Sequence, residues 1–387
     1  TVSSGRARRR AGRPSQGKGS YQGVSCLYAR PGTGHFCSVC DLHKPADRHL
    51  QIRMWRLDGP RTKPHKHPMT EKFTGSFTQQ EPIPDAAIDA AVAVLKSGRL
   101  HRYNTGPDEA GEVALLEQEF AAEMDAKYCL AVASGGYAMT TALRAIGVKP
   151  GDRVLTDAFA LAPGPGASAA VGGAPVFVGV TEDLVIDLDD LAAKSDQADV
   201  LLLSHMRGHI CDMDRLMALC DGAGIKIIED CAHTMGAKWR GRWSGRYGIV
   251  GGYSTQTYKH LNSGEGGFLV TDDDAVMARA VMLSGSYMLY GRHLAAPGAE
   301  AFEAVKYDTP NISGRMDHLR AAILRPQLQR LSSQCAAWNA RYREVEQGLN
   351  ACPGLRVIVR PEAETHVGSS SQFSLLDWDT ETVEDVL

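Results

Sequence analysis

The sequence predicts an α/β protein in which a parallel sheet is covered by helices on both faces. Short apolar runs alternate with helical stretches along most of the chain, which is typical of this class. The runs are also too apolar for half-exposed strands, which is typical of strands buried on both faces. They are LAVAS near 130–134, RVLTD near 153–157, PVFVGV at 175–180, VLLLS at 200–204 and KIIED at 226–230.

The ordered part of the chain is expected to begin with a helix after Pro82. Ile88, Val92 and Leu95 recur on one helical face, and Gly98 stands where a glycine ends many helices. This helix leads into the alternating segments.

Further elements are expected after the parallel strands. The run GGFLVT indicates another strand, and a long helical stretch begins near Arg315 and continues past Trp338. The pieces LRVIV and QFSLL are strand-like and start a smaller α+β domain. Because the chain stops at Leu387 inside a new helical pattern, we expect that domain to be truncated.

Composition indicates a globular protein. With 387 residues, 43% of them hydrophobic, the chain can bury a large core and form two domains, although one large domain is not excluded. No apolar run approaches the roughly 20 residues of a membrane helix, and no secretory signal is visible, so we expect a cytoplasmic protein without a membrane partner. The nine cysteines, an odd number, fit reduced thiols. Those expected in the core are Cys129, Cys211, Cys220 and Cys231.

The first 68 residues differ from the rest. They hold fourteen Lys or Arg against three Asp, and they show neither helical nor strand periodicity, which predicts disorder. This segment could be a basic arm that binds nucleic acid, or it could form a small zinc site. The zinc reading lacks a second well-spaced ligand pair; its candidates are Cys26, His35, Cys37, Cys40 and His43. We favour a third reading, in which residues 1–68 are not native coding sequence and the protein starts at Met69, with no metal and no nucleic acid bound.

Two residues near strand ends carry candidate chemistry, because ligands of such sheets gather at the carboxyl ends of the strands. Asp230 ends KIIED, where a carboxylate could keep a cationic ring nitrogen protonated. Lys259 lies on a short connection before a Gly-rich turn, where partial burial and positive charge could prepare an imine-forming amine. Taken singly, the first would more often be a helix cap and the second a surface lysine.

Candidate phosphate ligands accompany them. Ser134, Gly135 and Gly136 form a strand-to-helix turn with free backbone amides, and Ser254 can donate a hydroxyl. The GEGG run at 264–267 permits close approach of the backbone to a ligand, or serves as a plain tight turn.

Together these motifs resemble the DegT/StrS aminotransferases, over roughly residues 80–345 in order. The family's EDxAQ appears as EDCAH at 229–233, and its FSF, Lys and GEGG appear as YST at 253–255, Lys259 and GEGG at 264–267. HMRGHICDMD at 205–214 and GDRVL at 151–155 match two further blocks.

The resemblance implies a pyridoxal 5′-phosphate enzyme of fold type I, similar to aspartate aminotransferase. A large domain with a mostly parallel seven-stranded sheet would span 69–315, and a linking helix with the incomplete small domain would span 316–387. Lys259 would hold the cofactor as a Schiff base, Asp230 would support its ring nitrogen and His233 would approach its ring oxygen. Shared active sites in a homodimer are implied as well.

Three departures from the family pattern concern cofactor binding. Gly136 replaces a threonine, so one phosphate hydroxyl is lost. Leu161 replaces the aromatic residue that stacks on the ring, which gives up a stacking contribution. The Asn that reaches the phosphate of the neighbouring subunit corresponds to Ser313 or to Asn311, and both assignments stay open.

The resemblance predicts transfer of an amino group from Glu or Gln to a keto acceptor such as a nucleotide-linked keto-sugar. Dehydratases of this fold carry His in place of the lysine, so Lys259 favours the transaminase branch. Another reaction of the same cofactor, such as elimination or decarboxylation, and a non-catalytic sensor that binds it are the alternatives. Loops 100–104 and 287–293 are expected to set acceptor selectivity; Leu100, His101, Arg102 and Tyr103 either meet an anionic group or form an ordinary polar loop.

Overall fold

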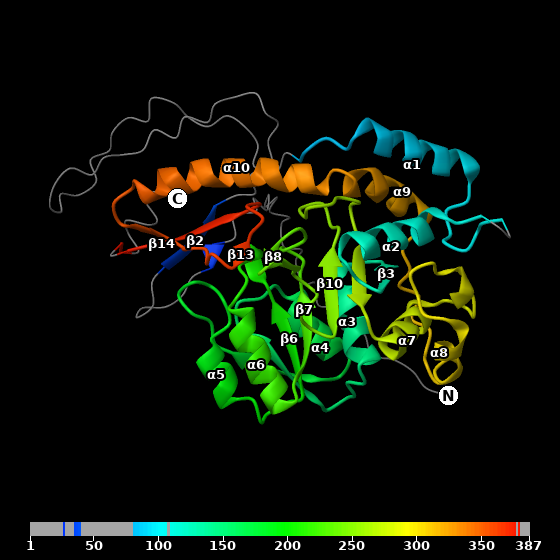
Figure 1. Cartoon of the computed structure of the whole chain (residues 1–387), viewed down its shortest axis with the longest axis horizontal. Coiled ribbons are helices and arrows are strands. Elements are labelled where there is room, and N and C mark those ends of the chain that lie inside the picture. Colours follow the sequence, from blue (N-terminus) through cyan, green and yellow to red (C-terminus); the bar gives the residue numbers. More distant parts are fainter. Residues whose placement is uncertain (1–25, 28–34, 40–79, 107–108, 377, 380–387) are drawn as a thin grey trace, which may run out of the picture.

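The computed structural model describes residues 26–27, 35–39, 80–106, 109–376 and 378–379, with backbone alone for the first two segments (Figure 1). Its central feature is a seven-stranded sheet in the order β3-β11-β10-β7-β6-β4-β5. β11 pairs antiparallel with both of its neighbours, and the pairs from β10 to β5 are all parallel. The strands are β3 (Tyr128–Val132), β4 (Arg153–Asp157), β5 (Ala174–Val178), β6 (Val200–Ser204), β7 (Lys226–Asp230), β10 (Val250–Ser254) and β11 (Gly267–Thr271).

Helices cover both faces of this sheet, and two apolar cores result. One core joins the sheet to α2, α5, α6, α9 and α10, and the other joins it to α3, α4, α7 and α8. The predicted α/β class and the mostly parallel seven-stranded sheet are confirmed. The helices are α1 (Asp85–Ser97), α2 (Glu112–Glu123), α3 (Gly135–Ala145), α4 (Pro163–Ala170), α5 (Leu188–Ala193), α6 (Met213–Ala223), α7 (Asp274–Ser284), α8 (Ala299–Glu303), α9 (His318–Leu328) and α10 (Leu331–Asn350), with short 3-10 turns at Met206–Gly208 and Tyr290–Arg292.

Alternation along β3 shows how one strand serves both cores. Cys129 and Ala131 belong to the core on the α2 side, whereas Leu130 and Val132 belong to the core on the α3 side. A strand buried on both faces is apolar at most positions, which explains why the sequence showed apolar runs without alternation. The four cysteines expected in the core are buried.

The first helix forms as predicted, but its apolar stripe is exposed. α1 ends at Gly98, which adopts φ 69° and caps the helix through a bond to Leu95. Ile88, Val92 and Leu95 are 48%, 40% and 55% exposed, because α1 packs against α9 through its other side (Figure 1).

The long helical stretch predicted after Arg315 is two helices. α9 ends at Leu328 and α10 begins at Leu331. Pro326 lies inside α9, where it lacks the N–H that an uninterrupted helix would use, and the break follows within one turn. The periodicity continued across the break and therefore did not reveal it.

Two smaller sheets complete the fold. The two strand-like pieces predicted near the C-terminus form β12 (Leu355–Val357) and β14 (Ser371–Leu375), and these two strands pair antiparallel. The third sheet contains β13 (Glu364–Thr365), β8 (Lys238–Trp239) and β9 (Arg242–Trp243). The expected domain boundaries stay predictions.

The N-terminal segment is only partly described. β1 (Cys26–Leu27) and β2 (His35–Val39) are strands, and β2 pairs with β14, which differs from the disorder expected for residues 1–68. Such pairing with a distant strand leaves no local periodicity in the sequence. The rest of that expectation, and the zinc reading of its side chains, lie outside the described residues. Among the helices described here, none is long and apolar enough to cross a membrane.

Candidate active site

Three polar residues end three neighbouring parallel strands at one edge of the sheet. Asp157 ends β4, Ser204 ends β6 and Asp230 ends β7, and Ser204 is the register partner of Asp230. The carboxyl ends of parallel strands meet at the same edge, where ligands of such sheets bind. Asp230 therefore lies at the predicted place.

Lys259 reaches the same edge from the turn after β10. Its Nζ lies 2.5 Å from Nε2 of His233, which follows β7. Nδ1 of His233 accepts the backbone N–H of Arg207 over 3.0 Å, so the proton of the neutral ring is on Nε2 and points to Nζ. In its neutral form, which is also the nucleophilic form, the amine accepts this N–H through its lone pair.

His233 is suited to stay neutral in this position. Burial, followed by the nearby Lys259 and Arg207, holds its pKa well below the ordinary value. A protonated ring would also have no lone pair for the N–H of Arg207.

The buried Asp230 carboxyl group would be stabilised in its ionised form by a positive charge. Burial raises its pKa, while the N–H of Ala232, which donates to Oδ1 over 3.1 Å, and the nearby Lys259 act in the opposite direction. A cationic ring nitrogen placed against this group would favour its ionised form. The residues present thus fit the pyridine end of the cofactor that the resemblance implied.

The candidate phosphate end is built by close approach of three segments. Ser134 caps α3, and its Oγ accepts the N–H of Tyr137 over 3.0 Å. A Cβ on Gly135 would lie 2.9 Å from Cβ of Ser254, and one on Gly267 would lie 2.7 Å from the backbone nitrogen of Gly135. Glycine is needed at both positions, so that β10 and β11 pack against the first turn of α3. The backbone N–H groups of that turn have no helical partner and favour an anion.

The remaining predicted ligands lie on two loops. Leu161 is 42% exposed on the loop between β4 and α4. Asn311 and Ser313 lie together, because Oδ1 of Asn311 accepts the N–H of Ser313 over 3.0 Å and its hydroxyl over 3.2 Å. This loop adjoins the α3 turn, since the N–H of Ala133 donates to the carbonyl of Gly314 over 2.8 Å.

The chain matches a known protein family. A model of the DegT/DnrJ/EryC1/StrS aminotransferase family matches residues 83–385. The chain belongs to this family. The resemblance found from the motifs is therefore confirmed, and with it the fold type.

Individual members of the DegT/DnrJ/EryC1/StrS family are similar over most of the chain. A dTDP-3-amino-3,4,6-trideoxy-alpha-D-glucose transaminase of Streptomyces venezuelae is 34% identical over 70% of this chain and 67% of its own length. An L-glutamine:2-deoxy-scyllo-inosose aminotransferase of Streptoalloteichus tenebrarius is 32% identical over 74% of this chain and 66% of its own length. The crystal structure of S. venezuelae DesV in complex with a ketimine intermediate superposes with a TM-score of 0.63 at 31% identity, covering 73% of this chain and 72% of that one. Matches to such relatives span between 40% and 67% of their lengths.

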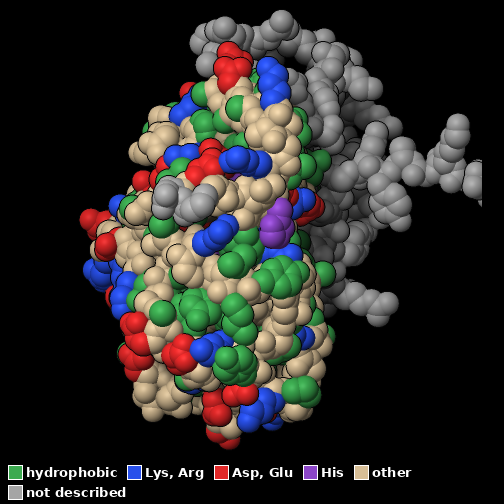
Figure 2. Space-filling model, turned by 90° about the vertical axis from the view of Figure 1, so that its right-hand side faces the viewer, with side chains coloured by type: hydrophobic (Ala, Val, Ile, Leu, Met, Phe, Trp, Pro, Cys, Tyr) green, Lys and Arg blue, Asp and Glu red, His purple; other side chains and the backbone are tan. Residues whose placement is uncertain are grey.

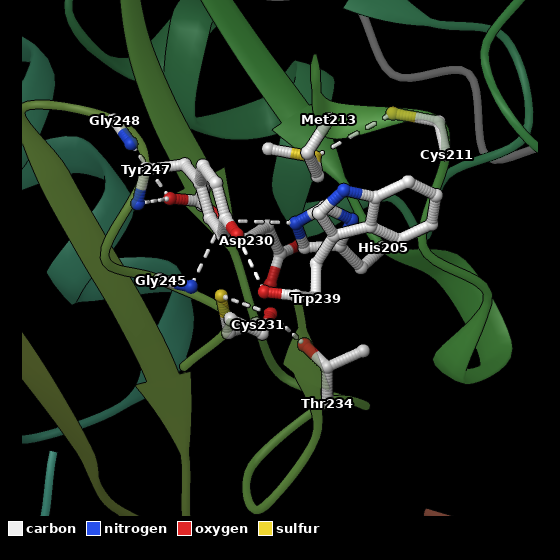
Figure 3. Close-up of polar contacts among 12 residues, drawn as sticks. His205, Cys211, Met213, Asp230, Cys231, Thr234, Trp239, Gly245, Tyr247 and Gly248 are labelled. Carbon is white, nitrogen blue, oxygen red and sulfur yellow. Dashed lines mark hydrogen bonds and ion pairs between the residues drawn. The ribbon is translucent and has the colours of Figure 1, made fainter. Parts of the chain in front are cut away.

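Next to Asp230 in β7, Glu229 organises a buried polar network. Its carboxylate accepts the N–H groups of Gly245, Tyr247 and Gly248 over 2.7–2.8 Å and contacts Nε2 of His205 at 3.1 Å (Figure 3). Together with Cys231, His205 and Glu229 could in principle hold a metal ion. These four contacts already occupy the Glu229 carboxylate. We therefore interpret Glu229 as a structural residue that holds β7 against the loop before β10.

One residue nominated for substrate contact has a different partner. Arg102, expected on a selectivity loop, makes two 2.9 Å bonds to the Glu117 carboxylate, and both side chains are buried. His293 joins them through Nδ1, 3.2 Å from Arg102, and Tyr103 contacts Nε2 of His293 at 2.8 Å. The network ties loop 100–104 to loop 287–293, and Arg102 is not free to bind an anion.

Sequence reasoning missed two residues at this edge. Asp157 is 2% exposed at the end of β4, and the strand-end argument that selected Asp230 applies equally to it. Arg207 follows β6, in the block that matches the family motif, but nothing in the sequence shows that its backbone holds His233.

Proposed function

We propose that this chain is a pyridoxal phosphate-dependent aminotransferase that moves an amino group from Glu or Gln to a keto acceptor. The observation that carries the proposal is the 2.5 Å contact between Lys259 Nζ and His233, beside the buried Asp230 carboxyl group. When bound, the cofactor supplies an aldehyde carbon for the lysine and a ring that withdraws electrons.

Each residue of the chain has a task in this proposal. Lys259 binds the cofactor covalently through Nζ and, once displaced by the donor, moves a proton. Asp230 keeps the ring nitrogen protonated, and His233 orients the amine and approaches the ring oxygen. The phosphate group is bound by Ser134, Gly135, Gly136 and Ser254.

Two further ligands complete the proposed cofactor site. Leu161 covers one face of the ring with an aliphatic side chain in place of an aromatic one. Asn311 or Ser313 reaches the phosphate of the neighbouring subunit, and their mutual hydrogen bonds fix the loop for either role.

The relatives support the proposed acceptor class. The names of two relatives refer to a dTDP-linked amino-sugar and to 2-deoxy-scyllo-inosose, and the second also names L-glutamine. A keto group on a nucleotide-linked sugar or a related cyclic polyol is therefore the acceptor to test first. Glutamine and glutamate are the donors to compare.

A homodimer is part of the proposal, because the family resemblance implies sites shared between subunits. Hydrophobic side chains gather on one face of the protein, over the segment that contains the 3-10 turn Tyr290–Arg292 and α8 (Figure 2). Those exposed by more than a third near loop 287–293 are Tyr287, Met288, Leu289, Leu294 and Ile312. Exposed apolar surface of this kind supports contact with a second copy.

The Lys259→Ala variant tests the proposed function. We expect it to lose both the visible absorption of the lysine-bound cofactor and turnover, whereas Lys96→Ala, which removes an exposed lysine of α1, keeps both. Retained absorption and turnover in Lys259→Ala would refute the assignment. Absorption in the wild type without reaction with either donor would instead favour a cofactor-binding sensor, and loss of amino-group balance would favour another reaction type.

A further inference from the structure

Most arginines around the site are already engaged by the protein itself. Arg102 is held by Glu117, and Arg315 donates to the carbonyl of Gly285 over 2.8 Å. Arg360 donates to the carbonyl of Gly208 over 2.6 Å and to Glu364 over 2.9 Å. Arg102 and Arg360 are thus each paired with a carboxylate, and the guanidinium of Arg315 is held by a backbone carbonyl.

Arg207 differs from them, because its two hydrogen bonds are made by its main chain. The N–H donates to Nδ1 of His233 over 3.0 Å, and the carbonyl accepts from Oγ of Ser370 over 3.2 Å. The side chain is half-buried, and within the described part of the chain no carboxylate pairs with its guanidinium. A half-buried cation without an anionic partner is costly unless a ligand supplies one.

The backbone at Arg207 is held in a conformation that favours glycine. Its φ is 57° and its ψ is 18°, inside the 3-10 turn Met206–Gly208. A long side chain in this region costs stability, and such positions persist where the surrounding bonds impose them, often at functional sites. The hydrogen bonds to His233 and Ser370 fix the main chain, so the guanidinium starts from a defined point.

The main chain of Arg207 lies close to the reacting amine of Lys259. Only the imidazole of His233 separates the main chain of Arg207 from Lys259 Nζ, through contacts of 3.0 and 2.5 Å. An amino-acid donor must bring its nitrogen to the place of Nζ, and its α-carboxylate is attached to the same carbon as that nitrogen. The carboxylate must therefore lie close to the Arg207 loop.

We propose that Arg207 binds the α-carboxylate of the amino donor and so selects α-amino acids as donors. The planar guanidinium suits this anion, since it can donate two parallel hydrogen bonds to one carboxylate. His233 stays neutral between the two groups and does not compete for the anion. The inference rests on the proposed function, because it needs a donor that reacts at Lys259.

The test compares Arg207→Gln, Arg207→Lys and Arg207→Gly in the cofactor-loaded protein. Dissociation constants for L-glutamate, L-glutamine and isoglutamine, whose α-carboxylate is amidated, are measured from the change in the visible absorption of the bound cofactor. We expect Arg207→Gln to weaken glutamate and glutamine about ten- to a hundredfold, the range for one charged hydrogen-bond partner, and to leave isoglutamine unchanged. Arg207→Lys keeps the charge without the fork and should lie between wild type and Arg207→Gln.

Arg207→Gly separates recognition from folding. Glycine adopts φ 57° without strain, so this variant removes the guanidinium while relaxing the backbone, and it should be as stable as the wild type or more so. Weak glutamate binding in a stable Arg207→Gly protein supports the proposal. Unchanged glutamate binding in both Arg207→Gln and Arg207→Gly overturns it.

Inorganic pyrophosphate, measured by calorimetry, probes the other anion that this site could receive. If the variants weaken pyrophosphate and leave glutamate unchanged, Arg207 serves a phosphate group of the acceptor and the proposal is wrong. Failure of the proposed function looks different, because Lys259→Ala would then keep the visible absorption whatever the Arg207 variants do.

Discussion

Asp157 accepts the backbone N–H of Ser204 through Oδ1 over 2.8 Å, which joins the ends of β4 and β6. Burial raises the pKa of Asp157 from its ordinary value of 3.8 to about 7, and the charge of Asp230 contributes, against the N–H of Ser204 and the nearby His205. The thiol of Cys211, itself buried, also faces this carboxyl group. The carboxyl group of Asp157 is thus a second buried acidic group beside Asp230, and its charge changes near neutral pH.

The first prediction is that Asp157 makes stability fall as pH rises. The folded protein binds this proton more tightly than the unfolded chain, so the folded state is destabilised progressively between pH 3.8 and about 7, and by a constant amount above that. The slope is about 1.4 kcal/mol for each pH unit in this window. Asp157→Asn keeps the acceptor for Ser204 and cannot ionise. We expect it to gain stability over the wild type from pH 5 to pH 7 in urea unfolding.

Asp196→Asn, which alters an exposed carboxylate, is the matched control and should follow the wild type at every pH. An Asp157→Asn variant whose difference from the wild type is the same at pH 5 and pH 8 would show that Asp157 does not titrate in this window.

The second prediction concerns the buried pair of Arg102 and Glu117. Glu117→Gln leaves the Arg102 charge without its partner, and the N–H of Ala131, 2.8 Å from Oε1, loses a charged acceptor. Breaking one side of a buried ion pair costs about 3–5 kcal/mol. We expect a loss of that size in urea unfolding, and the double variant Arg102→Met with Glu117→Leu should recover part of it. A Glu117→Gln protein as stable as the wild type would contradict the buried ion pair.

The fold could be read from the sequence to a large extent, because the strands of a doubly covered sheet are continuous apolar runs. β4, β6 and β7 were placed within their observed bounds for this reason. α1 also formed, but its exposed side could not be foreseen, since periodicity shows that a helix has an apolar face and not what covers it. The break between α9 and α10 stayed hidden for a similar reason.

The candidate site was predictable where chemistry is local to a motif. Asp230, His233 and Lys259 stand in two blocks with family spacing, and the structure brings them to one sheet edge. The tasks of Arg102 and Arg207 were not predictable. The guanidinium of Arg102 is bound by a glutamate on α2, whereas that of Arg207 pairs with no carboxylate among the described residues. Such a difference arises only from tertiary packing.

The third prediction is that His233 carries its proton on Nε2 and stays neutral far below its ordinary pKa. Since a buried neutral histidine must be charged when the chain unfolds in acid, it stabilises the fold above pH 6.5, and this contribution is lost as pH falls. Nitrogen chemical shifts of labelled histidine should show an acceptor Nδ1 and a protonated Nε2 from pH 7 down to pH 5.5. His293, which is buried beside Arg102 and Glu117, provides an internal comparison for the nitrogen chemical shifts of His233. A His233 that titrates in that range would exclude the lone-pair contact with Lys259.

The fourth prediction uses the hydroxyl that this chain lacks at Gly136. A Cβ there would meet Cβ of Pro163 at 3.5 Å, an ordinary contact, so the first side-chain atom of a threonine fits without displacing the backbone. Gly136→Thr should tighten binding of pyridoxal phosphate by about tenfold or more, because a hydrogen bond to a charged group is worth about 1.5–3 kcal/mol. Gly136→Ala adds the same Cβ without the hydroxyl and controls for helix propensity, so it should bind the cofactor as the wild type does.

Gly135→Ala should instead weaken cofactor binding, since a Cβ at this position would lie 2.9 Å from Cβ of Ser254 and push β10 away from the turn. Titration of the cofactor-free proteins by absorbance checks all three variants, and equal affinities for Gly136→Thr and Gly136→Ala would place the phosphate elsewhere.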